Sequence, residues 1–114
     1  MELFDPLARG AVGSITASAH LNTALFVRLF GLMQTGQLDA ARKLWRGLRP
    51  LTSAAFAEPN PAPLKAALAR QGWLQNELRA PMWPASEGTA DGLMATVAAA
   101  ELASGAAAKP STFG

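Results

Sequence analysis

The 114-residue chain contains no cysteine and a single histidine. Without cysteine it can form neither a disulfide bridge nor a thiolate nucleophile. His20 alone cannot build a metal cluster or a catalytic triad, so we expect no metal site. The sequence also lacks a glycine-rich phosphate loop and a G-x-S-x-G elbow, and we expect no bound cofactor.

Long apolar runs are absent as well. No run approaches the roughly 18 apolar residues of a membrane-spanning helix, so we expect no membrane segment. The acidic start, Met1 to Asp5, is unlike a signal peptide. Together with the lack of cysteine, this favours a cytoplasmic location. Half of the residues are apolar and 16% are charged, which argues against disorder and fits one domain with a core.

The charge balance is weak, with a formal net charge of +2. Arg42, Arg46 and Arg49 fall at helical spacing and share one face. No aromatic stacking platform or groove-reading motif accompanies them. We therefore interpret them as a solvated flank and expect no nucleic-acid partner.

The most distinctive stretch spans residues 56–72. Its prolines stand close together at Pro59, Pro61 and Pro63. A run of this kind cannot continue a helix, because each proline lacks an N–H and fixes φ. Asn60 is expected to cap a helix over 62–70, and Gly72 to end it. The stretch predicts a rigid elbow that leads into a short helix.

Helical periodicity accounts for most of the remaining chain. The expected helices have approximate bounds 1–9, 22–34, 37–55, 62–70 and 86–105. Pro50 should kink or end the helix that contains it. The predicted apolar faces comprise Leu25, Leu29, Leu32 and Met33, then Leu38, Ala41, Trp45, Leu48 and Leu51, and finally Leu93, Met94, Val97 and Leu102. Trp73 and Trp83 are expected to anchor a loop over 73–85.

Residues 11–17 differ from this pattern. They are mostly small, with β-branched residues near the end, and show no polar alternation. Such a run is typical of a strand buried on both faces in a parallel sheet. A lone strand would leave its N–H and C=O groups unpaired, and no second strand is evident. The segment therefore predicts neighbours that this sequence does not supply.

Three motifs resemble one family. Phe56 to Lys65 reads F-x-E-P-N-P-x-P-x-K, Leu78 to Pro84 is similar to L-R-x-P-M-x-P, and Gly10 to Ile15 fits G-x-x-G-x-I. These segments resemble the dihydrodipicolinate synthase / N-acetylneuraminate lyase family. Its members are pyruvate-dependent class I aldolases on an eight-stranded α/β barrel. The resemblance runs from about residue 3 to residue 100.

The resemblance implies a chain that is mainly α as it stands and corresponds to the C-terminal portion of a (β/α)8 TIM barrel. Residues 1–35 would form the end of the barrel, with a helix tail, the last strand and the last barrel helix. Residues 36–104 would form the appended C-terminal helical region. The alanine-rich residues 105–114 are expected to be a disordered tail.

The resemblance assigns one site residue. The family's counterpart of Ile15 lines the pyruvate pocket through its backbone carbonyl, beside the Schiff-base lysine. Barrel sites lie at the C-terminal ends of strands, and Gly13 permits a close approach, so the position is suitable. From the residues alone, Ile15 would be a core residue. His20 departs from the family's T-A-N pattern and is expected to be structural or solvent-facing, with a modest role near the substrate entrance as the alternative.

The family's Schiff-base lysine, proton-relay tyrosine and threonine-rich loop lie upstream of this segment. We therefore expect no catalytic residue here. Lys43 and Lys65 look like surface lysines, because a Schiff-base lysine needs a desolvated pocket. Glu58 is expected to pair with a cation or to cap a backbone group in the elbow.

The implied parent activity joins pyruvate, as an enamine on lysine, to an aldehyde. For aspartate semialdehyde the product feeds lysine biosynthesis, and the parent is expected to be a homo-oligomer, either tetramer or dimer. The chain alone is expected to be inactive. Two alternatives remain: another family aldolase that acts on sugar acids, and a stand-alone helical interaction module without catalysis.

Overall fold

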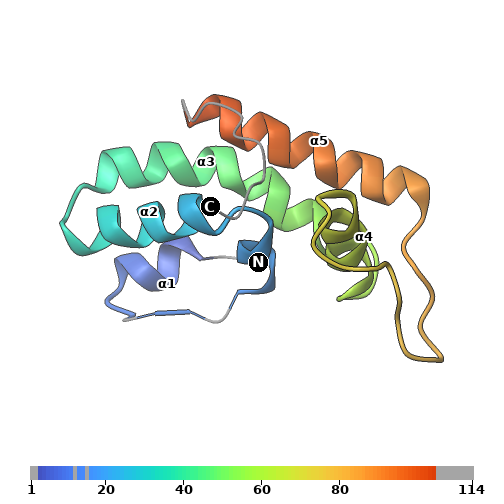
Figure 1. The fold of residues 1–114 in the computed structure, drawn as a ribbon. Coiled ribbons are helices and arrows are strands. Elements are labelled where there is room, and N and C mark those ends of the chain that lie inside the picture. Colours follow the sequence, from blue (N-terminus) through green and yellow to red (C-terminus); the bar gives the residue numbers. More distant parts are fainter. Residues whose placement is uncertain (1–2, 12, 15, 105–114) are drawn as a thin grey trace.

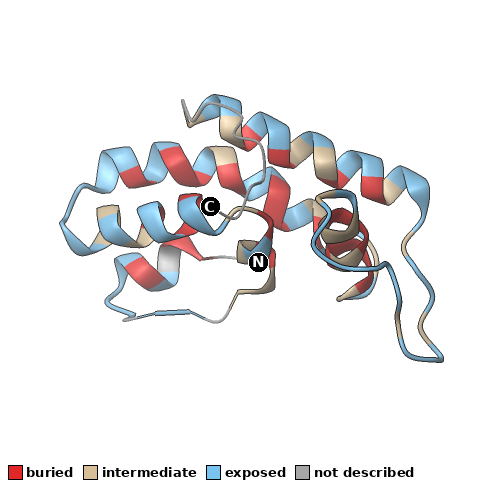
Figure 2. Cartoon of the chain, viewed as in Figure 1, coloured by how far each residue is buried: buried red, intermediate tan, exposed pale blue. Residues whose placement is uncertain are grey.

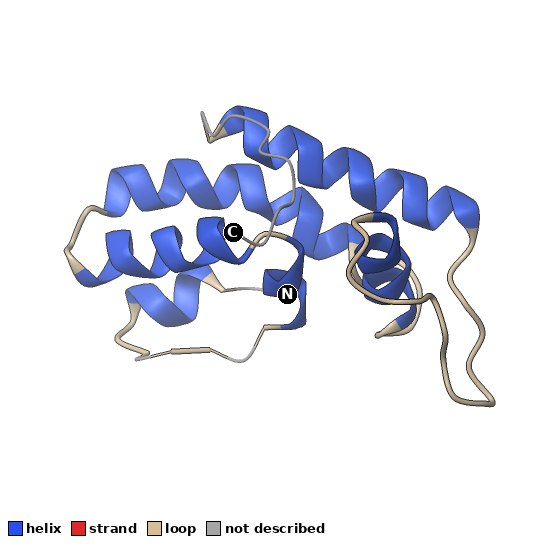
Figure 3. Cartoon of the chain, viewed as in Figure 1, coloured by secondary structure: helices blue, strands red, loops and turns tan. Residues whose placement is uncertain are grey.

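The computed structural model describes residues 3–11, 13–14 and 16–104. Its elements, in order, are α1 (Phe4–Ala8), the 3-10 helix η1 (Ala17–Leu21), α2 (Thr23–Gln34), α3 (Leu38–Ala54), α4 (Ala62–Arg70) and α5 (Glu87–Ala103). Within the described part of the chain there are helices and loops but no strand (Figure 3). None of these helices is both long and apolar enough to cross a membrane.

Helix α3 is the centre of the arrangement. It lies between α5 on one side and α2 on the other, with α1 next to α2 (Figure 1). Helix α4 packs against both α5 and η1, so it connects the C-terminal helix to the N-terminal part of the chain. The loop between α4 and α5 projects beyond the helices.

The helix starts follow from local capping. The Asn22 side chain accepts a hydrogen bond from the Leu25 N–H at 3.3 Å and so caps α2, which begins one residue after the expected bound of 22. Ser86 caps α5 in the same way, accepting from the Thr89 N–H at 3.2 Å. The prediction that Asn60 caps α4 is wrong. Pro61 occupies the cap position, so Asn60 lies one residue outside the helix.

Proline and glycine set the other boundaries. Helix α3 runs through Pro50 and ends at Ala54, so of the two predicted outcomes the continuing helix is observed. Helix α4 ends before Gly72, whose φ of 86° is a left-handed conformation that glycine adopts without strain. The sequence alone located both boundaries to within a residue.

One apolar cluster joins α1, η1, α2, α3, α4 and α5 (Figure 2). Its fully buried leucines are Leu29, Leu48, Leu51 and Leu93. Four predicted core or anchor positions are instead exposed: Leu38 (43%), Trp73 (43%), Trp83 (83%) and Leu102 (77%). They lie at helix ends or in the projecting loop, where no second element covers them.

The strand predicted over 11–17 is not formed among the described residues. Ala11, Gly13 and Ser14 are exposed, and η1 already begins at Ala17. The physical reason is the one foreseen above: a strand requires a neighbour for its backbone groups, and the described chain offers none.

Candidate functional site

The candidate site surrounds the extended segment between α1 and η1. Gly10, with φ of 100°, turns the chain away from α1. The hydroxyl groups of Ser14 and Thr16 then hydrogen-bond each other at 2.7 Å. Thr16 has φ −132° and ψ 110°, which is strand geometry. Thr16 thus has an extended backbone although the described residues form no strand.

Residues of this segment, together with α1 and α2, line a hollow of about 360 Å³. Its apolar walls include Leu3, Leu7, Phe26, Val27 and Phe30. Among the residues that the structure describes, no charged side chain lines it, and its polar side chains are the hydroxyl groups of Ser14, Thr16 and Thr23. The hollow is therefore mainly apolar, with hydroxyl groups as its hydrogen-bonding side chains.

Ile15, the site residue that the resemblance assigns, lies outside the described residues. Its role in a pyruvate pocket therefore stays a prediction. Its described neighbours Ser14 and Thr16 place this part of the chain beside the apolar hollow.

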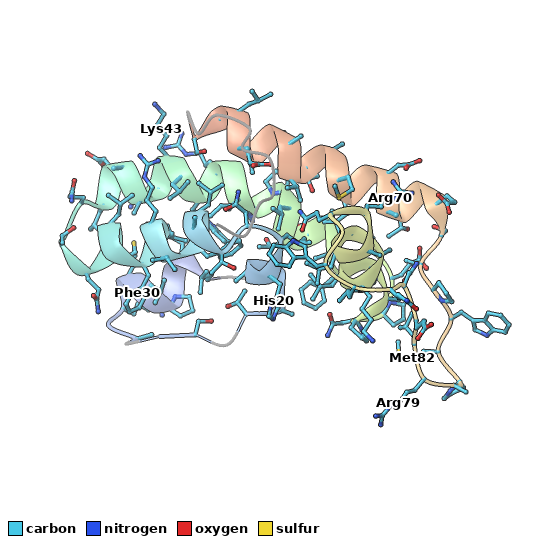
Figure 4. All side chains as sticks on the ribbon, in the orientation of Figure 1. His20, Phe30, Lys43, Arg70, Arg79 and Met82 are labelled. Atoms are coloured by element: carbon cyan, nitrogen blue, oxygen red, sulfur yellow. The ribbon has the colours of Figure 1, made fainter. Side chains whose placement is uncertain are left out.

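His20 is exposed at the end of η1. No hydrogen bond or ion pair links it to another described residue, and it lies apart from Lys43 and Arg70 (Figure 4). Across the described residues, no three histidine, cysteine, aspartate or glutamate side chains come together in a way that could hold a metal ion. The structure thus gives His20 no partner with which to act as an acid or a base.

Two of the lysines, Lys43 and Lys65, lie among the described residues. Lys43 is exposed and borders, together with Arg28, an open hollow of about 370 Å³ between α2, α3 and α5. Lys65 donates from Nζ to the backbone carbonyl of Glu77 at 2.9 Å. Neither amine lies in the desolvated pocket that a Schiff-base nucleophile requires, as predicted.

Glu58 links the proline elbow to the start of α5. Its carboxylate accepts from the Ser86 N–H at 3.1 Å and from the Ser86 hydroxyl at 2.8 Å. The Thr89 and Ser86 hydroxyl groups, together with the Ser86 N–H, hold the pKa of Glu58 below its ordinary value. A negative charge at a helix N-terminus is also favourable. Glu58 thus binds a backbone N–H, but not one in the elbow as expected, because the N–H belongs to Ser86, which lies 28 residues away in the sequence.

Sequence analysis did not foresee a second polar cluster, which joins α4 to α5. Arg70 in the last turn of α4 contacts both Asp91 and Glu87, the latter at 2.8 Å. These contacts, chiefly the hydrogen bond with Asp91, raise the pKa of Arg70. Glu87 and Asp91 are four residues apart on α5, a spacing that could have indicated a shared face. The cluster aligns two helices and has no reactive partner.

The segment around Glu58, the projecting loop and the segment that contains Gly10, Gly13 and Ser14 are those that carry the family motifs. A family profile described as "Dihydrodipicolinate synthetase family" matches residues 2–100. The 4-hydroxy-tetrahydrodipicolinate synthase of Thermotoga petrophila is 43% identical over 86 residues, which are 75% of this chain and 29% of the relative. The corresponding enzyme 2 of Clostridium acetobutylicum is 38% identical over 85 residues, 74% of this chain and 30% of the relative.

This chain is also similar in fold to solved structures. The crystal structure of dihydrodipicolinate synthase from Thermotoga maritima superposes with a TM-score of 0.82 at 38% identity, covering 87% of this chain and 34% of that one. A monomeric dihydrodipicolinate synthase variant gives the same TM-score of 0.82 and covers 33% of that chain. The chain thus spans under a third of the length of these curated relatives.

The fold class expected from the sequence is confirmed: the chain is helical as it stands and represents part of a barrel protein. Because the profile covers residues 2–100 and the fold agrees over 87% of the chain, this chain belongs to the dihydrodipicolinate synthetase family.

Proposed function

We propose that this chain is the C-terminal part of a pyruvate-dependent class I aldolase, 4-hydroxy-tetrahydrodipicolinate synthase. In that reaction a lysine amine condenses with the pyruvate ketone and releases water. Loss of a proton gives an enamine, which adds to the carbonyl carbon of aspartate semialdehyde. The parent would act in the cytoplasm, in lysine biosynthesis, as a homo-oligomer. The observation that carries the proposal is 43% identity to an enzyme of that name over 75% of the chain.

Within this parent, residues 1–35 would close the barrel and residues 36–104 would form the helical region behind it. Ile15 would line the pyruvate pocket through its backbone carbonyl. The position of the extended segment supports this, since barrel sites lie where strands end. The strand geometry of Thr16 marks that end, because η1 begins at the next residue.

The chain by itself would not turn over substrate. The Lys43 side chain is exposed and the Lys65 amine donates to the Glu77 carbonyl, so neither amine lies in the desolvated pocket that a nucleophilic lysine requires. Borohydride trapping with pyruvate, followed by mass spectrometry of the isolated chain, should show no adduct. An adduct on either lysine would contradict this expectation.

A chimera tests the activity itself. In the Thermotoga maritima relative, the matching part is replaced by residues 2–100 of this chain, and the unaltered relative is the control. The chimera should condense pyruvate with aspartate semialdehyde and yield a trapped adduct on the relative's lysine. A chimera that is folded by circular dichroism but forms no adduct would overturn the proposal.

A further inference from the structure

The hollow between α2, α3 and α5 combines positive charge with an apolar wall, and we call it the cationic hollow. Its volume is about 370 Å³, and it shares no lining residue with the hollow beside the extended segment. Arg28 on α2 and Lys43 on α3 are exposed at its border, whereas Leu44 and Ala100 are buried parts of its wall. A largely apolar cavity of this size with a few polar groups is typical of small-molecule sites.

Small residues on α3 and α5 leave this space open. Gly47 has no side chain, and a Cβ placed there would lie 3.4 Å from the Ala103 Cβ. The two helices are therefore in close contact at this point. Ala40 and Ala100 add only a methyl group each to the lining. The cationic hollow is thus a result of how the helices pack, and a larger side chain at its border would fill it.

The charges at the cationic hollow have one sign. Arg28 and Lys43 line it, and among the described residues no aspartate or glutamate does. Arg28 Nη1 donates to the Ser104 carbonyl at 3.4 Å, which uses one of the five N–H donors of the guanidinium group. This carbonyl follows the end of α5, where the helix dipole places about half a negative charge. Half a charge does not cancel two cations, so the hollow retains positive charge and hydrogen-bond donors for an anion.

We propose that the cationic hollow binds a small amphipathic carboxylate, that is, a carboxylate with a short alkyl or aromatic body. The Arg28 and Lys43 side chains donate to the carboxylate, and the apolar body lies against Leu44 and Ala100. A guanidinium group matches the two oxygens of a carboxylate in particular. Inorganic phosphate would leave the apolar wall uncovered, and a neutral alcohol would leave the cations without a counterion. The inference does not depend on the proposed aldolase activity.

Titration of the 114-residue chain with three probes tests the proposal. Hexanoate, 1-hexanol and inorganic phosphate are added at neutral pH and low ionic strength, and the amide NMR resonances of the isotope-labelled chain are followed. Hexanoate should shift the Arg28, Lys43 and Ala100 resonances to saturation, and the other two probes should bind at least about fivefold more weakly. Equal binding of phosphate, equal binding of 1-hexanol, or no saturable shift with hexanoate overturns the proposal.

Charge variants locate the carboxylate. Arg28→Gln and Lys43→Gln should each raise the Kd for hexanoate by about fivefold, because each removes one charge and keeps an amide that can donate. Arg46→Gln removes a charge from an exposed position of α3 that does not line the hollow, and should leave the Kd unchanged. If the Arg46 and Lys43 variants weaken binding equally, hexanoate responds only to the net charge of the chain and the proposal is wrong.

A second pair of variants locates the apolar body. Ala40→Leu places a larger side chain at the border of the cationic hollow and should raise the Kd for hexanoate at least about fivefold. Ala98→Leu makes the same change on α5 outside the hollow and should have no effect. Both positions are exposed, so neither change disturbs the core, and the dispersion of the amide resonances checks the fold. Hexanoate binding to a folded Ala40→Leu variant with the parent's Kd would exclude this hollow as the site.

Discussion

Replacing leucine by alanine at two positions of α5 measures how much packing in the helical core contributes to the free energy of unfolding. Leu93 is fully buried, with 0% of its side chain exposed, whereas Leu102 on the same helix is 77% exposed. Leu93→Ala and Leu102→Ala remove the same atoms from the same kind of backbone. Any difference between the two variants therefore reports packing and not helix propensity.

The expected magnitudes differ clearly. Leu93→Ala loses burial of the removed atoms and leaves a cavity against α3 and α4, which costs about 2–5 kcal/mol of unfolding free energy. For a domain of this size that corresponds to a fall in Tm of roughly 8–20 °C. Leu102→Ala removes an exposed side chain and should stay within about 0.5 kcal/mol of the parent.

Urea unfolding followed by far-UV circular dichroism is the assay. The Leu93→Ala midpoint should fall by roughly 1–2.5 M, with little change of slope. Two results would refute the reasoning. If both variants unfold like the parent, or if the parent itself unfolds without cooperativity, then the buried cluster does not hold the helices together.

The other predictions concern charge and backbone. Glu58→Gln should lower the Tm at neutral pH, and the difference from the parent should disappear in acid. The folded-state pKa of Glu58 is lowered, so the stabilisation is present above its ordinary value of 4.5 and is lost as the pH falls through the folded value. Thermal melts at several pH values check this, and a difference that is constant with pH would contradict it. Gly92→Ala, in the interior of α5 with no atom near the new Cβ, should raise the unfolding free energy by about 0.5–1 kcal/mol. Gly72→Ala should lower it, since φ is 86° there, and equal effects in urea unfolding would contradict the assigned backbone.

Where prolines and glycines interrupt the helical pattern, the sequence was sufficient to predict where the helices begin and end. Helix α4 begins at Ala62 and ends at Arg70, as expected. Helix α2 spans Thr23–Gln34, within one residue of the expected bounds 22–34. These boundaries depend on local backbone chemistry, which a sequence displays directly.

The solvent exposure of individual side chains was harder to predict, because it depends on which element packs against them. Trp83 looked like an anchor, yet it is 83% exposed in the projecting loop. Periodicity assigned Leu38 and Leu102 to apolar helix faces, yet they are 43% and 77% exposed. Periodicity identifies the face of a helix but not how far the neighbouring helix extends along it.

The residues of the candidate site were likewise predictable only in part. The family resemblance, and no local pattern, singled out Ile15, and its role stays a prediction because the residue lies outside the described part of the chain. The Arg70 cluster was missed because it joins residues that are 17 and 21 positions apart in the sequence. Such pairs become visible only after two helices are placed against each other.

The pinned ends of the α4–α5 connection have a practical consequence for protein engineering. Arg70 holds α4 to Glu87 at the base of the connection, and Lys65 fastens it again at Glu77. Between these fixed points, Arg79 lies near the tip of the loop (Figure 4), and both Arg79 and Trp83 are exposed. Extra residues inserted at the tip would add only a slowly growing loop-closure entropy. This tip is therefore a suitable place to graft a peptide epitope or a fluorescent reporter without disturbing the helices.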